Sequence, residues 1–426
     1  MNEKYWDLLH KVLANIGRYI VSIVFVFSGF VKIIDPLGFY YKVQDYAEAF
    51  HLTSIPDFFL LSISFMLSLL EFLIGLYLFF GVRRRISILI ALSLMVFMTP
   101  LTFILALTNP ISDCGCFGDA VVMSNWETFG KNIVLLAILF YLRKQRNRIV
   151  RFFSIETNWI VSTYCIVYIF ALGVYCLYFL PVLDFRPFKV GVDVANAMSI
   201  PEGAEEPVYE TIFIMEKGGK TAQFTLENYP DSTWSYVDSE TKLISAGYIP
   251  AIQNFSISDI NTGEDVADSI LAIQNYQFIL VAHRIDEADD SNIDLINEIY
   301  DYSKDNNYNF ICLTSSPIDA IEEWQDKSGA EYPFYQSDDI TLKTIIRSNP
   351  GLLLLKDGVI FNKWDHHSLP DEYELSAPLE QIPLGIIKHK STKNVLLAVV
   401  GWFFGPLLIV FGIDKIYQRR KLRRQK

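Results

Sequence analysis

The sequence contains little cysteine and little histidine, with five cysteines and six histidines spread over 426 residues. Protein metal sites commonly combine three or four cysteine, histidine or carboxylate ligands. The only adjacent histidines, His366 and His367, follow Asp365 in an expected loop, and no cysteine or carboxylate cluster completes the set. The sequence therefore predicts solvated histidines at this position and no metal site.

Signature motifs of several protein classes are also missing. The chain has no Walker-type, dinucleotide-binding or serine-nucleophile pattern, and it has no internal repeat or low-complexity tract. Basic residues form no patch inside an expected folded segment, which argues against nucleic acid as a partner. Charge is instead separated along the chain. Residues 181–390 carry a net charge of −22, and the remaining residues carry +10.

Long apolar runs explain why 51% of the residues are hydrophobic and 15% are aromatic. A helix needs about 20 apolar residues to cross a bilayer. Five runs have about this length. Another run, the fourth along the chain, is shorter and has Lys131 near its start. The expected spans are residues 16–34, 58–80, 86–107, 128–142, 159–180 and 395–413. No cleavage-like site follows the first run, so we expect an uncleaved helix and a polytopic α-helical protein in contact with the lipid bilayer.

The positions of lysine and arginine predict the orientation of these spans. Basic clusters lie at residues 83–85, 143–151 and 419–426. With six spans, all three clusters fall on one side of the membrane, and basic loops mark the cytoplasmic side. We therefore expect both termini in the cytoplasm and the acidic residues 181–390 on the opposite, periplasmic side.

A cysteine pair, Cys114-Gly115-Cys116, lies in a short polar segment between the third and fourth expected spans. Two thiols separated by one glycine can close into a strained ring, and a strained, exposed disulfide is easily reduced. The flanking Asp113 and Asp119 should raise the pKa of the thiols and slow their attack. Redox activity is slightly favoured over the alternatives, which are an inert structural bridge and two free thiols in a tight turn.

A third thiol, Cys176, is expected near the periplasmic end of the fifth span, about four residues or ~6 Å of helix before Pro181. Cys165 lies near mid-membrane and is too deep to join the pair. One hypothesis is that Cys176 resolves a mixed disulfide or relays electrons toward the bilayer. The alternative, that Cys176 is a small apolar residue packed between helices, is favoured.

Glu71 is the one acidic residue within the second expected span. A carboxylate inside the bilayer is costly and is by default a candidate for function. Judged by depth, Arg18 near the cytoplasmic start of the first span is a better partner for Glu71 than Lys32 at the far end. A structural ion pair that locks the two helices together is favoured over a proton relay.

The first third of the chain resembles a known membrane family. The residues that carry the resemblance are Arg18, the segment Phe27-Ser-Gly-Phe-Val-Lys-Ile-Ile-Asp-Pro36, Glu71, Gly75 and Gly81-Val-Arg83. They resemble the four-helix DoxX fold, and Cys114-Gly-Cys-Phe-Gly118 is similar to the signature of its MauE (methylamine utilisation) branch. The resemblance covers roughly residues 10–145. It implies a quinone- or thiol-linked role in the bacterial cell envelope, at the inner membrane, with a membrane quinone as a candidate cofactor.

The acidic block divides into two parts. Residues 185–246 contain short alternating runs that predict strands. From about residue 247, strands at 278–283, 310–314, 352–355 and 359–364 are interspersed with helices, as at 293–305. This order, and the proline before the penultimate strand, resemble a thioredoxin-like domain of the TlpA/peroxiredoxin type, with Pro350 at the cis-proline position. Residues 284–291 replace the Cys-x-x-Cys of that family, so no dithiol chemistry is expected there, and Cys312 is expected to be buried in a strand.

The predicted fold is a DoxX/MauE-like bundle with two further spans and a periplasmic α/β thioredoxin-like domain. The expected units are a four-helix membrane domain at 1–150, a fifth helix at 151–181, a β-rich lead-in at 182–246, the thioredoxin-like domain at 247–385, and a sixth helix with a basic tail at 394–426. Two functions remain open. One is thiol redox exchange between the Cys114/Cys116 pair and a quinone or an envelope dithiol. The other is a non-enzymatic scaffold whose acidic domain docks envelope proteins.

Overall fold

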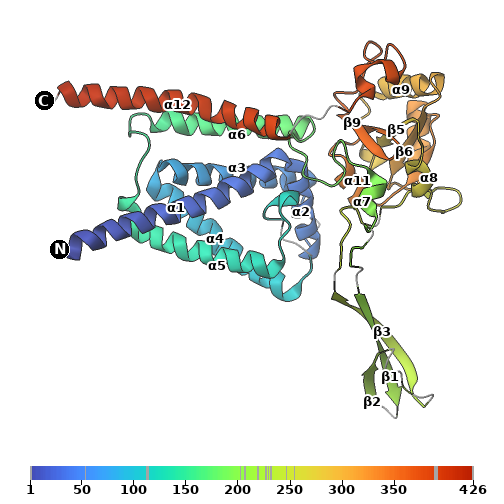
Figure 1. The fold of residues 1–426 in the computed structure, drawn as a ribbon, viewed down its shortest axis with the longest axis horizontal. Coiled ribbons are helices and arrows are strands. Elements are labelled where there is room, and N and C mark those ends of the chain that lie inside the picture. The colour runs from blue at the N-terminus through green and yellow to red at the C-terminus, as the bar shows by residue number, and fades with distance from the viewer. Residues whose placement is uncertain are drawn as a thin grey trace.

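The computed structural model contains a helical part, a mixed α/β domain and a three-stranded arm (Figure 1). It describes residues 2–52, 54–111, 115–201, 203–205, 208–217, 220–225, 228, 230, 233–245, 247–253, 255–387 and 392–424. Short 3-10 turns are η1 Gly118–Ala120, η2 Arg146–Arg148, η3 Ile285–Glu287, η4 Leu379–Gln381 and η5 Pro383–Gly385.

The helical part consists of α1 Asn2–Ile34, α2 Pro36–Ala49, α3 Asp57–Phe80, α4 Arg84–Thr108, α5 Asn125–Gln145, α6 Asn158–Tyr178 and α12 Thr392–Arg424. Five of the described helices are long and apolar enough to cross a membrane: α1, α3, α4, α6 and α12. This confirms a multi-pass membrane protein. The fourth expected span corresponds to α5, which is not among these five but lies along α4 (Figure 1).

The free ends of α1 and α12 lie at the same end of the helical part, away from the α/β domain (Figure 1). Contacts join the basic segments at this end. The Arg84 guanidinium donates to the Ile149 carbonyl at 2.7 Å. Arg148 contacts Asp7 at 2.8 Å, and Lys421 contacts Glu156 at 2.9 Å. The loop between α3 and α4, the connection between α5 and α6, and both ends of the chain are therefore neighbours.

Two glycines allow α1 and α3 to approach closely in antiparallel orientation. A Cβ atom at Gly29 would lie 2.4 Å from the Phe72 nitrogen, and one at Gly75 would lie 2.7 Å from the Val26 nitrogen. Small residues at such positions allow helix backbones to come into contact inside a bilayer. The two contacts place the last third of α1 beside the second half of α3 and so fix the register of the pair.

The α/β domain is built on one six-stranded mixed sheet. Its strands are β4 Ser258–Asp259, β5 Tyr276–Val281, β6 Asn309–Thr314, β7 Phe334–Gln336, β8 Gly351–Lys356 and β9 Val359–Asp365. The order across the sheet is β4-β7-β6-β5-β8-β9. Strands β5, β6 and β7 are parallel to one another, and β8 pairs antiparallel with both β5 and β9. The buried patterns of β5 and β8 are continuous, as expected for strands covered on both faces.

Helices and connecting segments cover both faces of this sheet. The helices are α7 Val194–Met198, α8 Ala267–Leu271, α9 Ile293–Asp305, α10 Ile318–Ser328 and α11 Asp339–Ile345. One apolar core includes residues of α9 and α10, and the other includes residues of α7, α8 and α11. Cys312 in β6 is fully buried in the first core, which confirms its predicted role as a small hydrophobe, and burial raises the pKa of its thiol.

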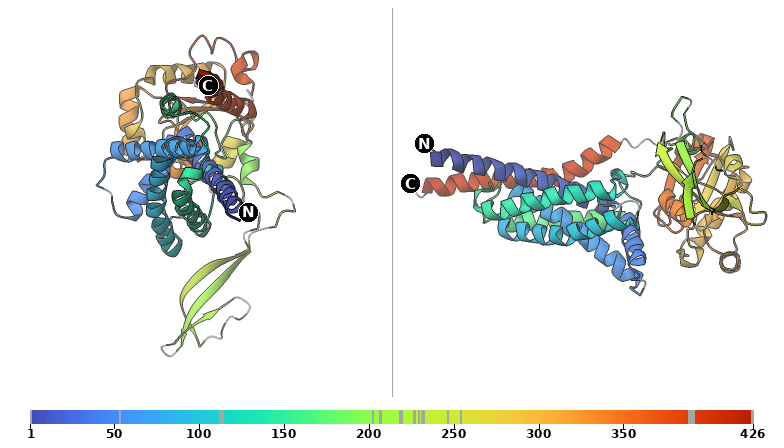
Figure 2. Two further views of the ribbon diagram at one scale, coloured as in Figure 1. Left: turned by 90° about the vertical axis from the view of Figure 1, so that its left-hand side faces the viewer. Right: turned by 90° about the horizontal axis from the view of Figure 1, so that it is seen from below.

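The segment before α7 belongs to the α/β domain, although the sequence assigned it to the β-rich lead-in. Gly191 donates to the Ile360 carbonyl, and the Ile360 nitrogen donates to the Val192 carbonyl, so this segment lies along β9. Strands β1 Val208–Lys217, β2 Lys220–Phe224 and β3 Ser235–Ser245 form a separate antiparallel sheet in the order β2-β1-β3. This arm extends away from both larger parts (Figures 1 and 2).

We predict that Gly29→Ala destabilises the membrane domain, whereas Gly130→Ala does not. The new Cβ at position 29 would overlap the Phe72 backbone, and such overpacking typically costs about 1–3 kcal/mol. Gly130 in α5 has no atom within 4 Å of its added Cβ, so helix propensity should leave that variant unchanged or slightly more stable. Thermal unfolding of both detergent-solubilised variants checks this. Equal midpoints would contradict the proposed helix register.

Candidate functional site

The cysteine loop, defined here as residues 115–120, is held against the last turns of α1. Cys114 lies outside the described residues. Cys116 is half-buried, and its carbonyl accepts a hydrogen bond from the Ser28 hydroxyl at 2.5 Å. The Phe117 ring lies 5.3 Å from the Phe27 ring, measured between centroids. Gly115 has a φ of +61°, which other residues rarely adopt, and it begins the turn that ends in η1.

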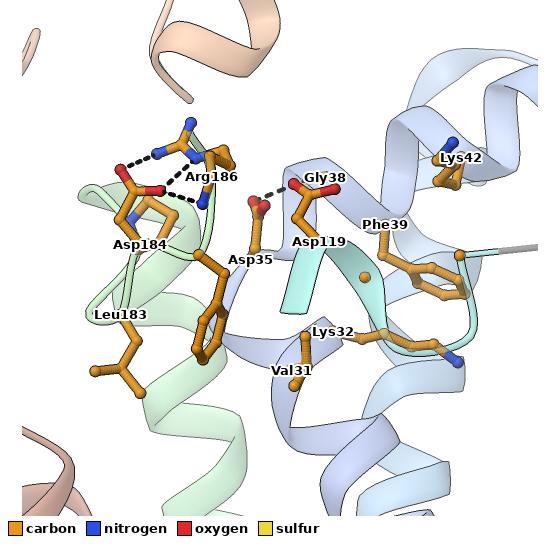
Figure 3. A pocket seen from close by; sticks show the side chains of 14 residues that line it. Val31, Lys32, Asp35, Gly38, Phe39, Lys42, Asp119, Leu183, Asp184 and Arg186 are labelled. Carbon is orange, nitrogen blue, oxygen red and sulfur yellow. Dashed lines mark hydrogen bonds and ion pairs between the residues drawn. The ribbon is translucent and has the colours of Figure 1, made fainter. Parts of the chain in front are cut away.

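An ion pair inside the helical part lies near this loop. The Lys32 ammonium and the Glu71 carboxylate are 2.7 Å apart, and their side chains are 3% and 13% exposed. Lys32 lines the same small pocket as Gly115 and Gly118 (Figure 3). The pair joins α1 to α3 next to the segment that carries Cys116.

The predicted pairing of Glu71 with Arg18 is therefore wrong. Arg18 is fully buried, but its guanidinium donates to the Val150 carbonyl at 2.6 Å and to the Tyr19 hydroxyl at 2.7 Å. The depth argument had placed Glu71 too close to the end of α3 beside which Arg18 lies. The contacts at Gly29 and Gly75 bring Lys32 level with Glu71, whereas Arg18 lies level with Gly81, whose added Cβ would be 2.9 Å from the Arg18 guanidinium.

A second charged group joins the cysteine loop to the α/β domain. Arg347, just after α11, contacts both oxygens of Asp35 through Nε, and its Nη2 contacts Asp35 at 3.0 Å and Asp119 at 3.1 Å. Asp35 lies at the end of α1 and also caps α2 by accepting from the Gly38 nitrogen. Asp119 lies in η1 of the cysteine loop. One guanidinium of the α/β domain thus holds two separate segments of the helical part.

The two carboxylates of this cluster differ in their surroundings. The Asp35 side chain is 19% exposed and the Asp119 side chain is 43% exposed. Burial by itself would raise the pKa of Asp35, but Arg347 and Arg186 outweigh it and hold that pKa below its ordinary value. Loss of hydration raises the pKa of Asp119, and the single contact with Arg347 only partly opposes this. Asp35 is therefore the main partner of Arg347, and Asp119 is the weaker one.

A third ionic group lies on the opposite side of the pocket, beyond the end of α6 (Figure 3). Asp184 contacts Arg186 at 2.7 Å and the ammonium of Lys363 at 3.3 Å. Lys363 belongs to β9, and burial lowers its pKa to about 8, although Asp184 opposes the shift. This group ties the end of α6 to the edge of the α/β sheet.

The edge of the α/β domain that faces α2 is formed by the segment after β5 and the segment before β8. Here η3 follows His283, and Pro350, in a cis peptide bond with Asn349, comes directly before β8. His283 is 8% exposed, and its burial lowers the pKa of the imidazole to about 4. The Tyr41 ring of α2 lies 6.4 Å from the His283 ring and 5.5 Å from the Arg347 guanidinium. Helix α2 thus lies beside this edge.

Cys176 and Cys165 lie inside α6, at 2% and 0% exposure. Both pack in an apolar cluster formed mainly by α1, α3 and α6 together with residues of α12. This packing favours the interpretation of Cys176 as a small apolar residue. A role as a third thiol remains a hypothesis without a supporting contact.

An apolar groove lies between α1, α3, α6 and α12, a feature that the sequence did not reveal. It has a free volume of about 300 Å³, and many of its lining residues are aromatic, among them Phe27, Phe30, Phe72, Phe79, Tyr168 and Phe403. Phe27 is shared, since it lines the groove and also contacts Phe117 of the cysteine loop. Across the part of the chain that the structure describes, no group of three histidine, cysteine or acidic residues could hold a metal ion.

Comparison with known proteins identifies two segments. Residues 10–143 match the family described as "Methylamine utilisation protein MauE", and residues 209–246 match a "Domain of unknown function (DUF8463)". The first match covers α1 to α5 almost completely and includes the cysteine loop, which confirms the predicted resemblance to MauE for this membrane domain. The second covers the three-stranded arm. No curated protein and no solved structure matches the chain significantly.

We predict that Glu71→Gln lowers the free energy of unfolding by about 3–5 kcal/mol, because it removes the carboxylate charge that faces the buried Lys32 ammonium. The double variant Lys32→Met/Glu71→Leu should recover most of that loss, since both charges are then replaced by apolar side chains. Thermal unfolding of the purified protein measures both effects. A Glu71→Gln protein that is as stable as the parent but inactive would contradict the structural role and favour a proton relay.

Proposed function

We propose that the chain is an inner-membrane thiol-redox component in which Cys114 and Cys116 exchange electrons with a lipid quinone or an envelope dithiol. The observation that carries this proposal is the position of the cysteine loop. It lies on the end of α1, beside the Lys32–Glu71 pair, and touches through Phe117 the ring of Phe27 that lines the apolar groove.

The proposed reaction balances in either direction. Oxidation of two thiols to a disulfide releases two electrons and two protons, and reduction of a quinone to a quinol takes up the same number. With an envelope dithiol, a thiolate of whichever pair is reduced attacks the disulfide of the oxidised pair. The second thiol of the attacking pair then resolves the mixed disulfide, so that one pair is oxidised and the other reduced. The aromatic, lipid-depth lining of the groove suits an apolar acceptor, which supports the quinone over a polar one.

The match of the membrane domain supports the same class of function. The family name connects residues 10–143 with methylamine utilisation. We extend to this chain only a role in an envelope process of that kind. The Cys-Gly-Cys sequence provides the chemistry that the loop could contribute.

The topology in this proposal has six spans, with both termini in the cytoplasm and the α/β domain in the periplasm. It is supported by α5 lying along α4, and by the contacts that gather the basic segments at the end of the helices that carries both termini. The cysteine loop then lies on the periplasmic side, where disulfides persist.

Protease added outside spheroplasts should digest residues of the α/β domain and spare an epitope tag placed after Arg424. A second tag at the N-terminus is the matched control, because six spans protect both tags and five spans expose one of them. Cleavage of one tag, or protection of the acidic domain, would contradict the six-span topology.

The α/β domain fits a thioredoxin-like fold without dithiol activity. This assignment is supported by the parallel β5-β6-β7 set beside the antiparallel β8 and β9, and by the absence of cysteine from residues 284–291. The scaffold function keeps one supporting observation of its own. The three-stranded arm extends away from the rest of the protein, where an envelope partner could bind it.

In intact cells, we predict that mass-tagging of thiols reveals two interconverting states of Cys114 and Cys116 that follow the oxidation state of the quinone pool. Cys114→Ser and Cys116→Ser should each abolish the interconversion. Cys176→Ser is the matched control, because its buried thiol should not be needed. If the pair stays in one state under every growth condition and its loss has no phenotype, the scaffold function replaces the redox function.

A further inference from the structure

Arg347 links the α/β domain to the cysteine loop through charge. We infer that Arg347 sets the reactivity of the Cys116 thiol, because docking of the α/β domain places its guanidinium on Asp119, three residues after Cys116. This inference rests on the proposed thiol chemistry and adds to it a residue that positions charge without touching the reacting sulfur. It makes the α/β domain, which has no dithiol of its own, a control element of the membrane thiols.

The cluster of Asp35, Asp119 and Arg347 is negatively charged overall. Asp35, Asp119 and Arg347 together carry a net charge of −1, and without the guanidinium the same site would carry −2. A thiolate is the nucleophilic form of cysteine, and a nearby negative charge raises the thiol pKa and reduces the thiolate fraction. Neutralisation of Asp119 by Arg347 therefore favours the reactive thiolate in the neighbouring loop.

The guanidinium is held in one orientation, so its charge has a fixed position. Its side chain is 6% exposed, Nε and Nη2 bind the Asp35 carboxylate, and Nη1 donates to the Lys343 carbonyl. Such a two-point contact suits the planar fork of arginine, and lysine would not reproduce it. The remaining contact of Nη2 reaches Asp119. Asp35 thus holds the arginine in place, and the arginine partly neutralises the charge of Asp119.

Other charged groups surround the loop, and they belong to the helices or to the connection that follows α6. Lys42 of α2 lies next to Gly115, and Lys131 of α5 lies 4.3 Å from the Phe117 ring centroid. The remaining groups are the Lys32–Glu71 pair, Asp45 beside Lys42, and Asp184 with Arg186. From the α/β domain, only Arg347 makes an ion pair with the described residues of the loop. Docking therefore adds one positive charge at this point.

The test measures the acidity of a single loop thiol in the full-length protein. In a Cys114→Ser background, the rate of iodoacetamide alkylation of Cys116 is followed against pH by peptide mass spectrometry. One neighbouring charge at a partly exposed site changes a pKa by roughly half a unit to one unit. Arg347→Gln should raise the alkylation midpoint by about that amount, which makes alkylation near neutral pH roughly three- to tenfold slower.

A set of variants separates charge from packing. The double variant Arg347→Gln/Asp119→Asn restores the net charge of −1 and should return the midpoint to that of the parent. Asp119→Asn alone keeps the Arg347–Asp35 anchor and should place the midpoint below the parent. Arg347→Lys keeps a positive charge beside Asp119, so its midpoint should stay below that of Arg347→Gln. A purely structural role for Arg347 predicts instead that the double variant is no better than Arg347→Gln.

The outcomes distinguish this inference from the proposed function. If Arg347→Gln leaves the midpoint unchanged, or if Asp119→Asn does not reverse its shift, the inference is wrong whatever the pair does in cells. If the midpoints follow the net charge but Cys114 and Cys116 never change their oxidation state in cells, the electrostatic coupling stands and the redox function fails.

Discussion

The close contact of α1 with α3 is the constraint on which the rest of the site depends. Two glycines remove the side chains that would separate the helices, and the resulting register has two consequences. It pairs Lys32 with Glu71 inside the membrane domain, and it sets the height at which α1 ends in Asp35. Ser28, on the same stretch of α1, holds the Cys116 carbonyl. The cysteine loop, the ion pair and the anchor of the α/β domain are thus all positioned by one helix.

Ionic contacts join the α/β domain to the helices. Arg347 and Lys363 are 6% and 4% exposed, and each is paired with carboxylates of segments that border the membrane. Buried pairs of this kind add little net stability, because desolvation offsets most of the attraction, whereas an unpaired buried charge costs several kcal/mol. A misplaced domain would leave such charges unpaired. We interpret the pairs as fixing one docked arrangement rather than as strengthening the fold.

This arrangement changes how a domain without a dithiol can contribute to thiol chemistry. The edge of the α/β domain next to α2 faces the membrane helices and presents Arg347 to them. Its contribution is therefore a positive charge on Asp119, three residues after Cys116 in another part of the chain. The groove between α1, α3, α6 and α12 lies on the other side of Phe27, so electrostatic control and an apolar acceptor would reach the loop from different directions.

Local properties of the sequence determined the apolar helices, the family resemblance of residues 10–143, the strands and helices of the α/β domain and the burial of Cys312. Each of these follows from a run of residues, because helix length and strand pattern are set by neighbours in the chain. The partner of Glu71 was predicted incorrectly, since its identity depends on how far two helices slide past each other, which two glycines decide. The contact between Arg347 and Asp119 joins residues 228 positions apart, and the groove combines four helices. Only the tertiary structure could decide these features, because no local pattern encodes which distant segments meet.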